Sequence, residues 1–248
     1  RMRLTTDALI IRENNNIGES DRFVTALTRD LGVIRASARG ARQLKNRSGA
    51  ATKLLTYSRL TLFRGRDKYI IDEAEPLQLF FELHSDIERL ALAQYFCELA
   101  GVLAPREEAA EPCLRLLLNA LHYLCTGGRD SRLIKAVVEL KLLAFAGYMP
   151  NLTACASCGA ADAAGFWLLP RDGILQCTAC RRNAFDGALP VSVTVLAAMR
   201  HILYGPFEKC YSFTLPEDGL TGLAQVSEAF LLAQLGRGFN SLDFYHTL

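Results

Sequence analysis

The stretch VIRASAR, at residues 33–39, decides the fold of the first third of the chain. Its apolar and polar residues alternate: Ile34, Ala36 and Ala38 fall on one face of an extended strand, and Arg35, Ser37 and Arg39 fall on the other. A period of two is typical of a strand that covers a core with one face and meets water with the other. The stretch therefore predicts a half-buried β-strand with a basic outer face.

Similar runs surround this strand. Residues 4–12, 22–28, 54–63 and 68–75 are rich in β-forming residues, and turn residues separate them. Five short strands within 80 residues leave no room for crossover helices. The pattern therefore predicts that residues 1–80 form an antiparallel sheet closed into a small OB-like barrel.

From about residue 83 the apolar residues repeat with a helical period. Three apolar stripes precede residue 150, and two further helices are expected at 192–204 and 220–235. A cysteine-bearing insert, residues 151–187, separates the third helix from the fourth. The expected fold class is α+β, with a barrel over 1–80 and a helical domain over 81–150 and 188–248 that carries the insert.

Charge is distributed unevenly along the chain. The 248 residues are 50% hydrophobic and 22% charged, which excludes a disordered or fibrous protein. The formal net charge of +2 divides into +6 over residues 1–80 (15 Lys and Arg, 9 Asp and Glu) and −4 over residues 81–248 (13 and 17). Residues 35–66 hold nine basic residues and no acidic one. A function must explain this positive segment.

The sequence is expected to belong to a cytosolic protein. The first residues lack the pattern of a secretory signal, and the longest uncharged stretch, 142–161, contains Pro150 and cannot span a membrane. In a reducing compartment, the eight cysteines are expected to be metal ligands and free thiols rather than disulfides.

The most specific motif is formed by two C-x2-C pairs, Cys155 with Cys158 and Cys177 with Cys180, which are separated by 18 residues. Each pair directs two sulfurs at one centre, and zinc prefers four ligands in a tetrahedron. Four thiolates leave no open position for water, so the spacing predicts one structural zinc ion per chain. The alternative is four unrelated buried cysteines, as the other four, Cys97, Cys113, Cys125 and Cys210, are expected to be.

Catalytic motifs are missing from the sequence. It has no phosphate-binding G-x-x-x-x-G-K-[ST] loop, no G-x-G-x-x-G, no G-x-S-x-G elbow and no paired-carboxylate cluster for Mg²⁺. We therefore expect a binding protein without catalytic residues rather than an enzyme.

The basic segment indicates nucleic-acid binding. Guanidinium groups neutralise phosphates, and aromatic faces can stack on unpaired bases. The alternative is a solvated basic surface without a ligand. Residues expected to contact DNA are Arg35, Arg39, Arg42, Lys45, Arg47, Tyr57 and Arg59.

The chain also resembles the RecO family of bacterial recombination mediators. The resemblance covers nearly the whole chain and rests on ALIIR at 8–12, IGESDRFVTALTRDLGVIRASARGAR at 17–42, LTLFRGR at 60–66, the four-cysteine insert with GIL at 173–175, and SLDF at 241–244. Within its most specific block, IGESDR, residues 18–21 suit a turn into the second strand better than a phosphate site.

The resemblance implies an OB-fold, a helical domain and a zinc knuckle. It also implies a protein that binds single- and double-stranded DNA, anneals complementary strands and, with RecR, helps load RecA onto DNA covered by single-stranded-DNA-binding protein (SSB). Some members hold the C-terminal tail of SSB in the helical domain. Such a protein would be cytoplasmic and would join the nucleoid when it acts on DNA.

Two other classes remain open from the residues alone. A zinc-ribbon transcription or RNA-binding factor would share the cysteines and the basic strand, and Arg181 and Arg182 would then extend the nucleic-acid surface onto the knuckle. A nuclease would need an acidic metal cluster, which the sequence does not display.

Overall fold

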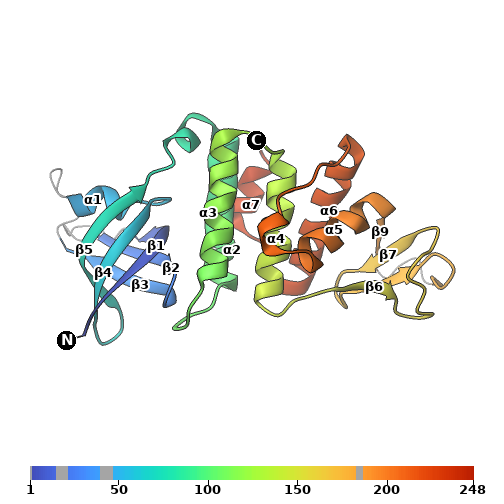
Figure 1. Cartoon of the computed structure of the whole chain (residues 1–248), viewed down its shortest axis with the longest axis horizontal. Coiled ribbons are helices and arrows are strands. Elements are labelled where there is room, and N and C mark those ends of the chain that lie inside the picture. Colours follow the sequence, from blue (N-terminus) through green and yellow to red (C-terminus); the bar gives the residue numbers. More distant parts are fainter. Residues whose placement is uncertain (1, 15–21, 40–46, 183–186) are drawn as a thin grey trace. The chain divides into compact units, whose positions relative to one another are not determined.

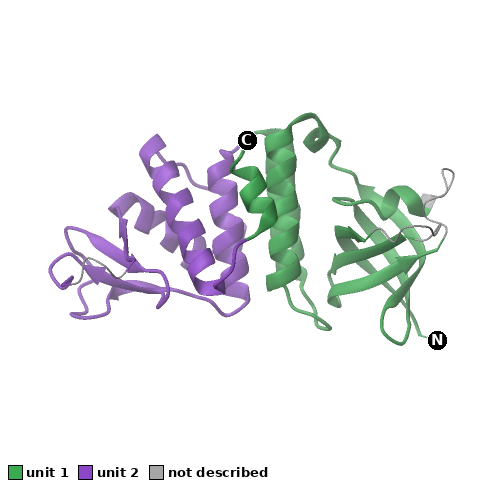
Figure 2. Ribbon diagram, turned by 180° about the vertical axis from the view of Figure 1, so that it is seen from behind, with its two compact units in different colours: residues 1–127, 239–248 green, residues 128–238 purple. Residues whose placement is uncertain are grey.

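A computed structural model of the chain describes residues 2–14, 22–39, 47–182 and 187–248. The chain divides into two compact units, which Figure 2 colours green and purple. The first unit joins residues 1–127 to residues 239–248, and the second holds residues 128–238. The turn predicted at 18–21 lies outside the described residues.

Five strands of the first unit form a closed barrel in the order β1-β2-β3-β5-β4 (Figure 1). Their bounds are Arg3–Asn14 (β1), Arg22–Thr28 (β2), Gly32–Ala38 (β3), Tyr57–Arg64 (β4) and Tyr69–Gln78 (β5). Five short strands closed in this order are typical of the OB-fold. The predicted barrel is therefore confirmed.

One strand pair departs from the expected antiparallel sheet. Strands β3 and β5 run parallel, with Ala36 opposite Tyr69 and Ala38 opposite Ile71, whereas the other four pairs of the barrel are antiparallel. The reason is topological. A closed ring with an odd number of strands cannot alternate in direction all the way around, so at least one neighbouring pair must run parallel.

On β3 the face that the alternation predicted fills the barrel interior, although Ser37, expected on the outer face, is buried as well. Ile34, Ala36 and Ala38 of β3 are buried in one cluster with Val24 and Ala26 of β2. Arg35 and Arg39 are exposed. The hydrophobic effect thus sets the register, because a slip of one residue would turn the arginines into the core.

The β2–β3 turn is fastened to the loop between helices α2 (Ile87–Leu103) and α3 (Glu111–Thr126). The backbone N–H of Val33 donates to the carbonyl of Pro105 (2.9 Å), and that of Ala110 donates to the carbonyl of Arg29 (2.9 Å). Gly32 has a φ of 66°, and a Cβ placed on it would lie 2.1 Å from the Pro105 carbonyl oxygen. This close approach, together with the positive φ, requires glycine.

Helices complete the first unit. They are α1 (Arg47–Ala51), the 3₁₀ helix η1 (Phe81–Ser85), α2 (Ile87–Leu103), α3 (Glu111–Thr126) and α7 (Asn240–Tyr245). The C-terminal α7 packs on α2, where the rings of Tyr95 and Phe239 meet edge to face and the N–H of Ser241 donates to Glu98 (3.2 Å). The short α1 and α7 were not predicted, because neither spans enough residues to show a helical period.

The second unit is built on α4 (Ser131–Phe145), α5 (Val193–Tyr204) and α6 (Glu217–Leu235), together with the 3₁₀ helix η2 (Phe207–Lys209). Helix α4 is buried on almost every side, and two of its buried charged residues, Lys135 and Glu139, are paired. The ammonium of Lys135 lies 3.1 Å from Glu139 and 2.9 Å from Glu228. Within the described ranges, every helix is too short or too polar to span a bilayer.

A small sheet projects from these helices. Its strands are β6 (Asn151–Cys155), β7 (Phe166–Leu169), β8 (Ile174–Cys177) and β9 (Leu189–Val191), in the order β6-β8-β7-β9. The first three lie within the predicted cysteine insert, and β9 leads into α5 (Figure 1).

Candidate metal centre and nucleic-acid interface

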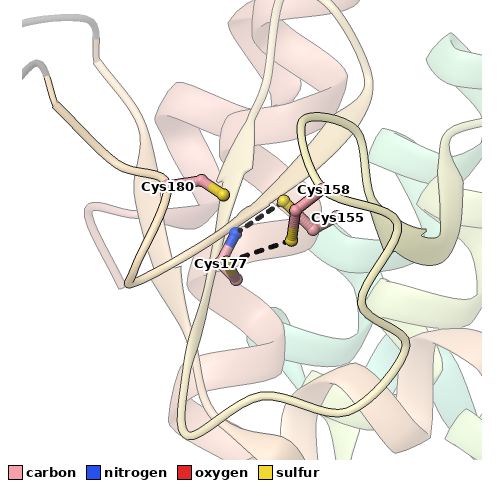
Figure 3. Close-up of side chains that lie close together, drawn as sticks. All are labelled: Cys155, Cys158, Cys177 and Cys180. Carbon is pink, nitrogen blue, oxygen red and sulfur yellow. Dashed lines mark hydrogen bonds between the residues drawn. The ribbon is translucent and has the colours of Figure 1, made fainter.

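The four cysteines of the paired motif meet at one end of this sheet (Figure 3). Cys155 ends β6 and Cys177 ends β8, and these two strands are neighbours, with Cys155 opposite Leu175. Cys158 and Cys180 lie in the turns that follow. Strand pairing therefore brings together two turns that are far apart in the sequence.

The spacing of the sulfurs suits a tetrahedral metal ion. All four Sγ atoms lie within 4.8 Å of one another, and those of Cys158 and Cys177 are 3.8 Å apart. A tetrahedron with metal–sulfur bonds of about 2.3 Å places its sulfurs about 3.8 Å apart. The cluster can therefore hold one metal ion, and its four ligands would leave no position open.

Backbone amides favour thiolates in this cluster. The N–H of Cys177 donates to Sγ of Cys155 (3.3 Å). This contact, with a second one from the backbone of Cys158, lowers the pKa of Cys155 to about 6. Cys180, in contrast, shares hydrogen bonds with Cys158 and Cys177 that raise its pKa. A metal ion would displace such shared protons, because thiolates are the ligands.

The remaining thiols have the environment of packed apolar side chains. Cys97 and Cys113 are buried, and burial raises their pKa to about 12 and about 11. Burial also raises the pKa of Cys125 and Cys210. At neutral pH these four side chains are protonated and therefore poor nucleophiles.

A cleft of about 310 Å³ opens on the outer surface of the barrel. Its walls come from the end of β1, from β2 and β3, and from the β4–β5 loop. The residues that line it are Asn14, Phe23, Val24, Arg35, Ala36, Asp67 and Lys68. OB-folds bind oligonucleotides on the β2–β3 face, flanked by the β1–β2 and β4–β5 loops. The cleft occupies this position.

The cleft combines an aromatic ring with cations. The ammonium of Lys68 lies 4.1 Å from the ring centroid of Phe23, and Arg35 is exposed in the same lining. Arg39 extends from the same face of β3, just beyond the end of the strand. These side chains can meet phosphates and the face of a base at once.

Tyr57 and Arg59 do not line this cleft. On β4 they lie opposite Leu9 and Asp7 of β1. The guanidinium of Arg59 is 3.0 Å from the carboxylate of Asp7, and desolvation raises the pKa of the half-buried Tyr57. The positive charge of Arg59 is thus partly neutralised at its own site.

The side chains of the three other predicted DNA contacts, Arg42, Lys45 and Arg47, are not described by the structure. Arg42 and Lys45 lie outside the described residues, as does the side chain of Arg47, the first residue of α1. Arg22, which follows the predicted turn, donates to the carbonyl of Gly49 (2.6 Å) and so fastens β2 to α1.

Four residues of the cleft lining, Asn14, Phe23, Asp67 and Lys68, were not among the predicted DNA contacts. A signal for Phe23 was available, because Val24 and Ala26 face the core and the alternation of β2 therefore turns Phe23 outward. Lys68 and Asp67 carried no such signal. Their place beside Arg35 depends on the pairing of β3 with β5.

Comparison with known proteins connects both units to one family. Residues 2–80 match the model "Recombination protein O N terminal", and residues 84–243 match "Recombination protein O C terminal". The "DNA repair protein RecO" of Acetivibrio thermocellus is 33% identical over 247 residues, 99% of this chain and 97% of that protein. The protein of the same name from Symbiobacterium thermophilum is 34% identical, over 98% and 96%. This chain therefore belongs to the RecO family.

Proposed function

We propose that this chain is a DNA-binding mediator of recombinational repair. It binds single- and double-stranded DNA on the barrel, anneals complementary strands and, together with RecR, helps load RecA onto SSB-coated DNA. The observation that carries the proposal is the cleft at the oligonucleotide-binding position of an OB-type barrel, lined by Arg35, Lys68 and Phe23. The family assignment supports it, since the relatives are named DNA repair proteins.

The cleft suits a strand backbone together with at least one unpaired base. Arg35 and Lys68 supply fixed positive charge, so binding releases the counterions that surround the phosphates. Phe23 offers a ring on which a base can stack when the Lys68 ammonium, 4.1 Å from the ring centroid, moves from the ring to a phosphate, and stacking tolerates any sequence. Nothing in this chemistry cleaves a bond, so the activity we propose is binding and annealing, not catalysis.

The metal that we propose for the four-cysteine cluster is zinc. Four thiolates at tetrahedral spacing are a donor set that zinc accepts readily, and a closed site of this kind is structural. Zinc would hold the turns after β6 and β8 together and so order the sheet from which they project.

Annealing and binding test this proposal directly. Fluorescence anisotropy of labelled single strands and duplexes should show affinity that falls with salt, with a logarithmic slope of about 0.7 per neutralised phosphate for single strands and about 0.9 for duplexes. Annealing should proceed without ATP, because the sequence has no phosphate-binding loop. Binding restricted to one sequence or to RNA would instead favour a zinc-ribbon transcription or RNA-binding factor. As a recombination mediator, the protein would act in the cytoplasm, at the nucleoid.

We place the site for the acidic, apolar tail of SSB on the helices of the second unit. Two cations there are already engaged, because Arg132 pairs with Asp130 and Glu217, and Lys135 is buried between two glutamates; a third candidate, Arg115, lies in the first unit and pairs with Glu111. Lys141 differs from these three. Its side chain is 7% exposed, its ammonium lies 5.3 Å and 5.6 Å from the ring centroids of Phe145 and Phe207, and among the described residues no carboxylate lies within ion-pair distance of it.

We expect Lys141→Met to weaken binding of an SSB-tail peptide by about tenfold, because it removes one charge-assisted contact to a carboxylate. Methionine keeps the apolar stem, so melting should change little. Arg132→Ala serves as the control and should bind the peptide like the wild type. Calorimetric titration measures both affinities, and equal binding by the wild type and Lys141→Met would remove Lys141 from the site.

A further inference from the structure

The barrel cleft contains one acidic residue among its cations. Asp67 lies in the β4–β5 loop, between Arg66 and Lys68, and lines the cleft together with Arg35. Its side chain is exposed. Among the described residues, no Lys, Arg or His nitrogen comes within 4.0 Å of its carboxylate, so the charge of Asp67 is not consumed by an ion pair.

A carboxylate at this position opposes the binding of a phosphate backbone. Like charges repel across the short distances of a cleft, and a site built for phosphates alone would gain from a neutral residue there. The turn itself does not require the charge. The Gly65 N–H donates to the Lys68 carbonyl (2.9 Å), and an uncharged asparagine suits such turns as well as aspartate does.

Base edges provide a partner for this carboxylate. An ionised carboxylate only accepts hydrogen bonds, and the N4 amino group of cytosine donates them. Thymine presents the O4 carbonyl at the corresponding position, which a carboxylate repels. The two pyrimidines are similar in size and shape, so stacking on Phe23 would discriminate little between them. Asp67 is therefore the lining residue suited to tell one from the other.

We propose that the barrel cleft binds one unpaired base that carries an exocyclic amino group, with Asp67 as the hydrogen-bond acceptor, Phe23 as the stacking surface, and Arg35 and Lys68 on the flanking phosphates. A volume of about 310 Å³ fits a single base rather than a run of bases. The inference rests on the proposed function. It adds a modest base preference to an affinity that phosphates and stacking supply for every sequence.

Oligodeoxycytidine and oligodeoxythymidine of equal length form the matched pair of probes, because they differ in the groups that Asp67 would meet. We expect the wild type to bind the cytidine strand about tenfold more tightly, the discrimination of one good base contact, as measured by anisotropy at neutral pH and constant salt. Asp67→Asn should bring the two affinities to within about twofold, because the amide both donates and accepts.

The chain offers a close control for this substitution. Asp172 is also exposed, also follows an arginine, and lies in the turn between β7 and β8 of the other unit. Asp172→Asn changes the net charge by the same amount and should leave the tenfold preference intact. Thermal unfolding of both variants should match the wild type, since both side chains are in solvent.

The outcomes separate this inference from the proposed function. If the wild type binds both strands equally, or if Asp67→Asn raises both affinities by the same factor, the base-reading role is wrong and DNA binding by the barrel stands. If the preference falls equally in Asp172→Asn, the effect is one of net charge and the inference also fails. If the wild type binds neither strand, the proposed function and this inference both fail.

Discussion

Cys177→Ser is expected to release the metal and to disorder the four-stranded sheet of β6, β7, β8 and β9. Wild-type protein should carry about one zinc per chain, as one closed four-thiolate site requires. In small units, zinc binding supplies roughly 10–16 kcal/mol of apparent free energy, and much of that energy is folding energy. Cys177 is the last residue of β8, which lies between β6 and β7, and it pairs with Phe166 of β7, so its loss affects an inner strand of the sheet.

Metal content by mass spectrometry and proteolysis of the β6–β8 region measure this effect. The matched control is Cys125→Ser, which replaces a cysteine of the other unit. This variant should still bind zinc at the four-cysteine cluster. Chelation of the wild type should reproduce the effect, and added zinc should reverse it. DNA binding by the barrel should persist, because the barrel has its own buried core. Metal-free protein with an unchanged unfolding curve would contradict a structural zinc.

The second large effect is expected from reversing two cations of the barrel cleft. Arg35→Glu combined with Lys68→Glu changes the charge of the lining cations from +2 to −2 beside Phe23 and Asp67. We expect affinity for single strands to fall by at least about 100-fold at physiological salt, and annealing to be lost. The salt dependence of any residual binding should be shallower by roughly one unit per lost phosphate contact. Both side chains are exposed, so the fold should be unaffected.

A second double reversal controls for net charge and tests the competing surface. Arg171→Glu combined with Arg182→Glu makes the same change at two exposed positions of the knuckle. If the barrel is the DNA site, this variant should bind and anneal nearly like the wild type. If instead the knuckle variant loses binding and the barrel variant retains it, the nucleic-acid surface lies on the zinc knuckle.

Local periodicity predicted the elements of the barrel well. In residues 33–39 the structure buries Ile34, Ala36 and Ala38 and exposes Arg35 and Arg39, as the alternation predicts, but it also buries Ser37, which was expected on the outer face. The later helices were also predicted, although α6 begins at Glu217, three residues before the expected start, directly after Pro216. Acidic residues at 217 and 218 favour this start, because they complement the helix dipole.

The sequence by itself determined what depends on near neighbours in the chain: which residues of β3 carry the core, where the longer helices run, and that two C-x2-C turns could share one metal. Only the tertiary structure decided which outward-facing residues meet. Periodicity assigns a side chain to a face but does not show which strands become neighbours when a sheet closes. Arg59 therefore lies against Asp7 through the β1–β4 pair, whereas the parallel pairing of β3 with β5 brings Lys68 and Asp67 beside Arg35.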